Sequence, residues 1–440
     1  MADDLGYGDL GCYGQKLIKT PRLDQMAKEG MKFTRFYSGS TVCAPSRSVL
    51  MTGQHMGHTH VRGNAGGDMS RQSLRNIDLT VAEKLKETGY KTALIGKWGL
   101  GEVGQEGHPL KQGFDYFYGY LNQVHAHNFY PEFLWRNQKK HVLKNVVKPV
   151  SDKPRAGFMG GAATKRVEYS HDLFTAEALT WIRANKENPF FLYLPLTIPH
   201  ANNEGTRMFG DGAEVPDHGI YEKENWTKQD KGQAAMITRM DRDVGRLLDL
   251  LKELKIEENT LVMFTSDNGP HNEAGHNPEL FKPAGPLRGM KRTLTEGGIR
   301  VPTLAWWPNT IEPNSISDQP FYFGDLMATA CDMSQSDMPL QTDSLSFLPT
   351  LKGKAEEQKR HKFLYWEFYE RTFRQAVIME EWKLIRSGMD NQRLELYDLK
   401  NDIHEDVNLI KEQPAVAQRM LSYMESAHVP HPNWTTPKRK

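Results

Sequence analysis

Residues 41–53 read Thr41-Val42-Cys43-Ala44-Pro45-Ser46-Arg47-Ser48-Val49-Leu50-Met51-Thr52-Gly53, and the rest of the chain is organised around this stretch. We expect Ser46 to cap a short helix that runs through the following apolar residues. Free cysteines are among the most buried residue types, so Cys43 can be a core thiol. A thiol at a helix N-terminus beside Arg47 instead tends towards thiolate. Local chemistry therefore leaves a structural and a reactive cysteine equally open.

Length and composition allow one large domain, or one large and one small domain. The 440 residues carry 56 Lys and Arg against 55 Asp and Glu, a formal net charge of +1. No global field therefore attracts nucleic acid or an anionic membrane surface. Three cysteines cannot make a disulfide framework. No stretch is long and apolar enough to span a bilayer, so we expect neither a nucleic-acid partner nor a membrane span.

Helices and strands alternate along most of the chain. Apolar runs at 90–95, 190–194 and 259–265 predict strands, and apolar steps of three and four at 234–254 predict an amphipathic helix. This alternation is typical of a mostly parallel sheet with helices on both faces, an α/β fold. Beyond about residue 353, short strands followed by a helix predict a small antiparallel α+β unit. We expect two domains, residues 1–352 and 353–440.

Polar residues follow three of the predicted strands, where open α/β sheets bind their ligands. Lys97 follows the first strand, His200 the second, and Asp267-Asn268 the third. The ordinary interpretations stay open, because most lysines are exposed and Asp-Asn-Gly is good turn chemistry. Asp3-Asp4 precedes a glycine-rich turn, and acidic pairs are often solvated loops. Together the acidic and amide oxygens also suit a hard cation such as Ca²⁺.

The run Cys43-x-Pro45-Ser46-Arg47-x-x-Leu50-x-Thr52-Gly53 resembles the signature of the type I, formylglycine-dependent sulfatases, which are arylsulfatase-like members of the alkaline phosphatase superfamily. Further matching stretches extend from Asp3 to about Arg300. The resemblance implies an alkaline-phosphatase-like sheet sandwiched by helices, with a smaller C-terminal domain. It also implies that a formylglycine-generating maturation enzyme oxidises Cys43 to an aldehyde, whose hydrate attacks the sulfur of a sulfate ester.

The same resemblance assigns roles to individual residues. It implies one Ca²⁺ per chain, held by Asp3, Asp4, Asp267, Asn268 and the residue at position 43. It implies that the sulfate is met by Arg47, Lys97, His200 and Lys291 around Cys43. His200 or Lys291 would protonate the leaving oxygen, and Asp267 would take the proton of the nucleophile. The histidines of residues 53–60 are a pattern that transition-metal sites also use, but the resemblance places a surface loop there.

The sequence departs from the family at two places. Gly99 stands two residues after Lys97, where most members carry a histidine that steadies the hydrated formylglycine. We expect His127 or His125 to replace that imidazole, with His108 a weaker candidate. In addition, only two residues precede the acidic pair, so we expect the family's first strand to be truncated here. Both departures keep a catalytically impaired glycan-binding relative open as an alternative.

The nature of the substrate is a further expectation. The aromatic residues from Phe114 to Tyr130 and the histidine-rich rim favour a sulfated carbohydrate over a small aryl sulfate. A phosphonate or phosphodiester hydrolase of the same superfamily is the alternative reaction. We expect a periplasmic or secreted location if the full-length protein carries a signal peptide.

Overall fold

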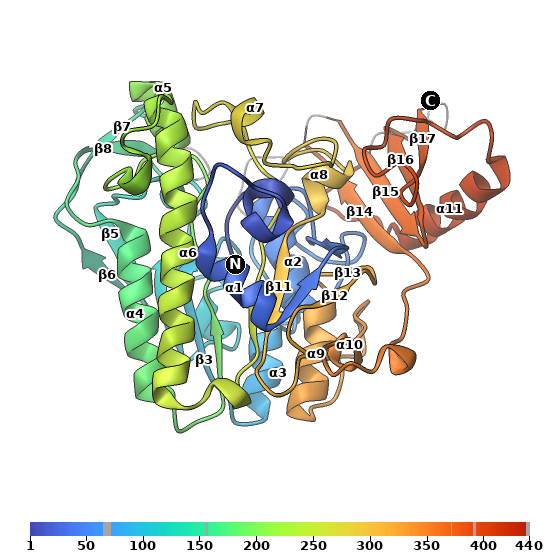
Figure 1. Ribbon diagram of the computed structural model, residues 1–440, viewed down its shortest axis with the longest axis horizontal. Coiled ribbons are helices and arrows are strands. Elements are labelled where there is room, and N and C mark those ends of the chain that lie inside the picture. Colours follow the sequence, from blue (N-terminus) through green and yellow to red (C-terminus); the bar gives the residue numbers. More distant parts are fainter. Residues whose placement is uncertain (65–71, 155–156, 371, 390–392, 437–440) are drawn as a thin grey trace.

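The computed structural model describes residues 1–64, 72–154, 157–370, 372–389 and 393–436. Figure 1 shows a body of strands flanked by helices, which holds the N-terminal and central parts of the chain. A smaller unit built from the C-terminal part lies beside this body. This arrangement confirms the predicted α/β class with a small α+β unit. None of the described helices is long and apolar enough to cross a membrane.

The first sheet of the main body lies in the order β6-β5-β4-β3-β9. Its members are β3 (Lys91–Lys97), β4 (Tyr116–Tyr120), β5 (Phe133–Arg136), β6 (Lys139–Val142) and β9 (Phe190–Tyr193). Strand β3 pairs in parallel with β4 and β9, whereas β5 and β6 are antiparallel. Leu94 and Ile95 are fully buried on opposite sides of β3, which explains the continuous apolar run in the sequence.

The second sheet of the main body lies in the order β10-β11-β1-β12. Its members are β1 (Met31–Phe33), β10 (Val262–Phe264), β11 (Thr303–Trp306) and β12 (Ser315–Ser317), and a separate parallel pair is β2 (Phe36–Tyr37) with β13 (Phe321–Tyr322). The first two residues lie between the sheets. The Met1 ammonium donates to the Leu194 carbonyl at 2.9 Å, and the Ala2 amide donates to the Thr265 carbonyl at 2.7 Å. Ala2 forms an isolated parallel bridge with Ser266.

Helices cover both faces of the first sheet. The α-helices of the described residues, in both units and in chain order, are α1 (Pro21–Glu29), α2 (Cys43–Thr52), α3 (Val81–Glu87), α4 (Ser170–Asn185), α5 (Asn203–Phe209), α6 (Lys228–Leu254), α7 (Pro278–Phe281), α8 (Glu296–Ile299), α9 (Asp325–Ser334), α10 (Leu348–Leu351) and α11 (Pro414–Ala427). Phe174 of α4 packs with Ile95, whereas Val49 of α2 and Ala82 of α3 belong to the core cluster of Leu94. Figure 1 shows α4 and α6 side by side at the front of the body. Helix α6 contains the predicted amphipathic helix and begins at Lys228, because Thr227 caps it.

The polar stretch at 139–165 is more regular than its sequence indicates. It contains β6 and the antiparallel pair β7 (Val146–Pro149) and β8 (Gly161–Lys165). Because β6 and β7 are largely exposed, they lack the apolar alternation by which a strand is recognised.

The C-terminal unit is the predicted antiparallel sheet with one helix. Its strands are β14 (Leu364–Phe368), β15 (Arg374–Met379), β16 (Trp382–Ser387) and β17 (Leu394–Asp398), each antiparallel to the next. Met420 and Met424 of α11 pack on Val377 of β15 in the core of this unit. The division at residue 352 stays a prediction, and it falls between α10 and β14.

Candidate active site

Helix α2 places Cys43 and Arg47 on one face, one turn apart. The helix begins at Cys43 itself and ends at Gly53, which has a left-handed φ of 69°. The prediction that Ser46 caps this helix is wrong, because Ser46 lies inside it. The Ser46 hydroxyl donates instead to the Asp267 carbonyl at 2.6 Å, and it accepts from the Gly39 amide. Ser46 thus ties α2 to the loop after β10.

The Cys43 thiol is buried against a carboxylate. Its Sγ donates to Asp3 Oδ1 at 3.4 Å. Burial, reinforced by the negative charge of Asp3, raises the pKa of the Cys43 thiol well above its usual value. The expected tendency towards thiolate is therefore wrong in these surroundings, because burial and Asp3 outweigh the neighbouring Lys97 and the helix N-terminus.

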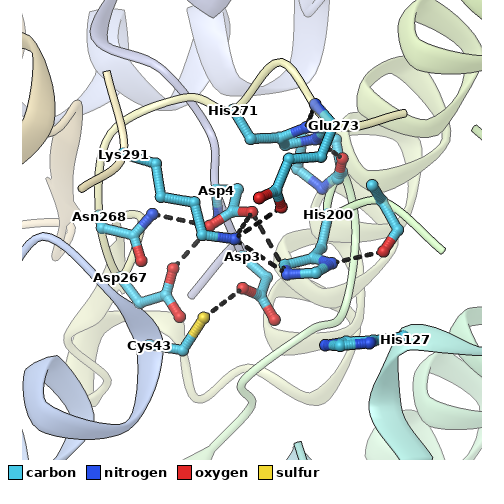
Figure 2. A network of polar contacts seen from close by, with 12 residues as sticks. Asp3, Asp4, Cys43, His127, His200, Asp267, Asn268, His271, Glu273 and Lys291 are labelled. Atoms are coloured by element: carbon cyan, nitrogen blue, oxygen red, sulfur yellow. Dashed lines mark hydrogen bonds and ion pairs between the residues drawn. The ribbon is translucent and has the colours of Figure 1, made fainter. Parts of the chain in front are cut away.

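Oxygen ligands from two distant parts of the chain meet beside Cys43 (Figure 2). Asp4 has a left-handed φ of 64°, and its amide donates to Asp267 Oδ1 at 3.1 Å. The Asn268 amide nitrogen donates to Asp4 Oδ1 at 2.7 Å, and Asn268 Oδ1 is buried with no hydrogen-bond partner among the described residues. Carboxylate and amide oxygens on irregular backbone are the ligands that Ca²⁺ prefers. The residues present therefore fit a hard divalent cation.

Three buried cations face the three carboxylates of this group. The closest pairs are Lys97 Nζ to Asp3 Oδ2 at 2.7 Å, Lys291 Nζ to Asp4 Oδ2 at 2.6 Å, and Arg47 Nη2 to Asp267 Oδ2 at 2.7 Å. Burial opposes ionisation, yet the surrounding charges and hydrogen bonds, with Lys97 foremost for Asp3 and Lys291 foremost for Asp4, together lower the pKa of each carboxyl to about 2. Burial, followed by the charge of Asp3, raises the pKa of Asp267 to about 6.

His200 is buried beside Lys291 and Asp4. Its Nδ1 donates to the Ala201 carbonyl at 2.6 Å, so Nε2 is the acceptor of the neutral ring. Nε2 lies 3.1 Å from Lys291 Nζ and 3.4 Å from Asp4 Oδ2. Burial, followed by the charge of Lys291, lowers the pKa of His200 well below its usual value. A neutral His200 can therefore accept a proton shared with the Lys291 ammonium.

The structure brings together every residue that the sequence assigned to nucleophile, sulfate or metal. We call this set the Cys43 cluster, and it comprises Asp3, Asp4, Cys43, Arg47, Lys97, His200, Asp267, Asn268 and Lys291. It joins the start of the chain, the first turns of α2, the last residue of β3, the segments that follow β9 and β10, and the loop between α7 and α8.

The three histidines proposed to compensate for Gly99 lie in different surroundings. The His127 ring stacks on His200, with ring centroids 5.1 Å apart and an interplanar angle of 14°. The His125 ring is buried among aromatic side chains, 4.3 Å from the ring of Phe158. His108 Nδ1 accepts from the Leu110 amide at the start of a short turn. The structure therefore brings His127 to the Cys43 cluster and leaves His125 and His108 outside it.

Gln123 fills the space beside Gly99. Gly99 has a left-handed φ of 83°, and a Cβ atom at this position would lie 2.1 Å from Gln123 Nε2. That nitrogen is buried and has no hydrogen-bond partner in the described part of the chain. Sequence reasoning missed Gln123, because no motif distinguishes an isolated glutamine.

Sequence reasoning also missed two carboxylates around the Cys43 cluster. Glu273 Oε2 lies 3.3 Å from Lys291 Nζ, and Glu273 also forms an ion pair with Arg292. Glu204 accepts a hydrogen bond from His127 Nδ1 at 3.0 Å. Glu204 follows His200 by four residues, and Glu273 follows Asn268 by five. Their proximity to ligand-bearing strand ends was the one available signal.

The aromatic stretch from Phe114 to Tyr130 and the histidines of residues 53–60 both have structural surroundings. Most aromatic side chains between Phe114 and Tyr130 are buried in the hydrophobic cores, so the expectation that they meet a sugar is wrong for them. His55 and His58 lie beside Asp343, with His58 Nδ1 2.8 Å from Asp343 Oδ2. However, His55 Nδ1 accepts from the Gly57 amide, so its Nε2 carries the proton and is no ligand. This group ties down a loop.

Comparison with family models and curated proteins identifies the family of the chain. The model described as Sulfatase matches residues 1–336, and that described as N-sulphoglucosamine sulphohydrolase, C-terminal, matches residues 290–428. The N-acetylgalactosamine-6-O-sulfatase of Bacteroides thetaiotaomicron is 29% identical, over 97% of this chain and 91% of that protein. The N-acetylgalactosamine-6-sulfatase of Mus musculus is 33% identical, over 81% of this chain. The chain spans only 66% of the length of that mouse relative.

Solved structures extend the similarity over the whole fold. The structure of Ps i-CgsB in complex with k-i-k-neocarrahexaose matches with a TM-score of 0.79 and 26% identity, over 100% of this chain and 94% of that chain. A Bacteroides thetaiotaomicron structure, from work on the metabolism of multiple glycosaminoglycans, matches with a TM-score of 0.77 and 26% identity, over 97% of each chain.

Proposed function

The chain belongs to the sulfatase family of sulfuric ester hydrolases, and we propose that it removes sulfate from a sulfated carbohydrate with formylglycine, derived from Cys43, as the nucleophile. The observation that carries this proposal is the position of the Cys43 thiol. It lies within the cluster of carboxylates, lysines and His200, and it is hydrogen-bonded to Asp3. Formylglycine supplies a hydrated aldehyde where the unmodified side chain has only a thiol of raised pKa.

A divalent cation, with Ca²⁺ the expected ion, belongs to the same proposal. Asp3, Asp4, Asp267 and Asn268 would hold it, and the residue at position 43 lies beside them. When bound, such a cation supplies positive charge that offsets the charge of the sulfate oxygens. The unpartnered Oδ1 of Asn268 supports this assignment, because a buried polar atom without a partner is costly unless a ligand meets it.

The side chains of this chain supply the remaining charge. Lys97 has three N–H donors, so it can keep its bond to Asp3 and also donate to a sulfate oxygen. Lys291 contacts Asp4, His200 and Glu273, so a sulfate oxygen would replace its longest contact, the one with Glu273 at 3.3 Å. Arg47 holds Lys97 in place by donating from Nη1 to its carbonyl at 2.6 Å. Each such oriented donor is worth on the order of 3 kcal/mol in a buried site.

His200 and Lys291 are placed to protonate the leaving oxygen. His200 Nε2 is 3.1 Å from the Lys291 ammonium, so the pair holds a proton between two groups that both belong to the Cys43 cluster. Transfer of this proton neutralises the alkoxide as the ester bond breaks. Gln123 fills the place where most members of the family carry a histidine, and its free Nε2 can donate there without changing charge.

The relatives narrow the carbohydrate that should be tested first. Two of them carry names that specify a 6-sulfate of N-acetylgalactosamine. We therefore assign a 6-O-sulfated hexosamine as the first candidate substrate, and a formylglycine-generating enzyme as the maturation partner.

The decisive experiment combines maturation with turnover. The chain is produced with and without a formylglycine-generating system, and the peptide containing Cys43 is weighed by mass spectrometry. Sulfate release is then measured from N-acetylgalactosamine 6-sulfate and from 4-nitrophenyl sulfate, with Cys43→Ala as the control. We expect the aldehyde and turnover to appear together. Faster cleavage of an aryl phosphodiester would favour the alternative reaction, and glycan binding without sulfate release would favour a binding protein.

A further inference from the structure

Glu204 and His127 form a buried carboxylate–imidazole pair next to the Cys43 cluster. His127 Nδ1 donates to Glu204 Oε2 at 3.0 Å, and the Glu204 side chain is 1% exposed. Burial opposes ionisation of Glu204, but the hydrogen bond from His127 acts together with further favourable contacts, and the net effect lowers the pKa of Glu204. An ionised carboxylate can only accept, so in a ring that carries a single N–H it fixes that proton on Nδ1. His127 Nε2 is then an acceptor.

The pair lies on the outer side of the catalytic histidine. The His200 side chain is 3% exposed, whereas the His127 side chain stacked on it is 13% exposed. Figure 2 shows the His127 ring beside His200 and away from Lys291. A sulfate ester must place its sulfate among the lysines, so its alcohol part extends from the cluster towards the exposed side. His127 lies where that alcohol part passes.

A single segment, residues 200–204, carries His200 and also Glu204, which holds His127. His200 follows β9, and Glu204 lies in the first turn of α5 four residues later. Asn202 caps α5 by accepting from the Gly205 amide, and its amide nitrogen donates to Glu214 at 2.7 Å. Glu204 is therefore held in a capped helical turn, four residues after His200.

We propose that Glu204 is a positioning residue that presents His127 Nε2 as a hydrogen-bond acceptor for a hydroxyl or amide N–H of the sugar that carries the sulfate. A sulfate monoester has acceptors and no donors, so an acceptor side chain cannot serve the sulfate itself. It serves a neighbouring donor group, which carbohydrates have and aryl sulfates lack. This inference rests on the proposed sulfatase function and specifies its substrate side.

The test compares two substrates across matched variants. In Glu204→Gln the amide can donate as well as accept, so the proton of His127 is no longer confined to Nδ1. We expect KM for N-acetylgalactosamine 6-sulfate to rise about tenfold, the value of one hydrogen bond. We expect kcat and KM for 4-nitrophenyl sulfate to stay unchanged, because that ester offers no donor. Glu204→Asp, which retains the carboxylate, should recover part of the loss.

A structural control and a spectroscopic readout complete the design. Asp243→Asn removes a carboxylate from another buried pair, with His171, whose atoms are 3.1 Å apart. It should leave the ratio of the two substrates unchanged. Nitrogen-15 spectra should show the Nδ1–H form of His127 in the parent chain and a mixed form in Glu204→Gln, with His127→Gln as the assignment control.

Each outcome decides between the alternatives. Equal losses on both substrates in Glu204→Gln, or an Nε2–H form of His127 in the parent chain, would overturn the inference. Absence of turnover of either substrate by the mature parent chain would instead contradict the proposed function. In Glu204→Gln, an unchanged KM for the sugar substrate together with an altered nitrogen-15 spectrum of His127 would show that Glu204 orients His127 but that His127 does not contact the sugar. This result would also overturn the inference.

Discussion

Replacing Gly99 by alanine separates two reasons for glycine at that position. The first reason is the backbone, because φ of Gly99 is 83°, in the left-handed region that favours glycine. The second is space, because the new Cβ would lie 2.1 Å from Nε2 and 2.9 Å from Cδ of Gln123. If Gln123 occupies the position of the family's histidine, substitutions at Gly99 and at Gln123 must be energetically coupled.

The geometry sets the size of each contribution. A non-glycine residue in the left-handed region costs about 1–2 kcal/mol. Moving Gln123 from its present rotamer costs a further 0.5–1.5 kcal/mol or so. We therefore expect Gly99→Ala to lower the free energy of unfolding by about 1.5–3.5 kcal/mol. In a Gln123→Ala background the clash is absent, so the same change should cost only the backbone part, about 1–2 kcal/mol.

The assay is urea unfolding of the parent, the two single variants and the double variant. Gly89→Ala is the matched control, because Gly89 has a φ of 89° and a Cβ there would have no atom within 4 Å. It isolates the backbone cost. The reasoning fails if Gly99→Ala costs no more than Gly89→Ala, or if its cost is the same with and without the Gln123 side chain.

Three further predictions concern stability, pH and metal. Lys383 is fully buried, and its Nζ lies 2.9 Å from a Glu296 oxygen and 3.1 Å from a Glu405 oxygen. Lys383→Met should therefore lower the free energy of urea unfolding by about 3–5 kcal/mol. Exposed Arg183→Met is the control that should leave stability unaltered, and the same result for Lys383→Met would contradict this prediction. Burial lowers the pKa of His125 to about 3, so between about pH 6.5 and pH 3 the unfolded chain binds a proton that the folded chain does not. The parent should therefore lose about 1.4 kcal/mol per pH unit on acidification relative to His125→Phe, and parallel pH–stability curves would refute this. Removing divalent cations with a chelator should abolish sulfate release but leave the chain folded with a lower Tm, and added Ca²⁺ should restore both; full activity after chelation would exclude a metal role.

Residues whose role follows from their place at the end of a strand were predictable from the sequence. Lys97, His200 and Asp267 each stand just after an apolar strand, and the parallel pairing of β3 and β9 brings such strand ends to one edge. The motif around Cys43 then supplied the proposed nucleophile. Physical rules about strands gave the location, and the family resemblance gave the chemistry.

Residues whose role depends on a contact with a distant segment were not predictable from the sequence. Gln123 matters because it occupies space that a glycine leaves, and Glu204 matters because a ring from another segment stacks nearby. Both relations join side chains that are distant in sequence, so no local pattern encodes them. Ser46 shows the same limit, because its hydroxyl satisfies a carbonyl of the β10 loop rather than its own helix.

The charge balance of the Cys43 cluster constrains its chemistry. Three carboxylates and three cations are buried in contact, so the group is near neutrality without any ligand. A buried anion alone would find Lys97 and Lys291 already engaged by Asp3 and Asp4, and a buried divalent cation alone would leave those lysines uncompensated. When a divalent cation binds the carboxylates and a sulfate ester anion binds the lysines, the net charge of the Cys43 cluster changes by only one unit. We therefore expect metal and sulfate ester to bind cooperatively, and equal Ca²⁺ affinity with and without sulfate would contradict this coupling.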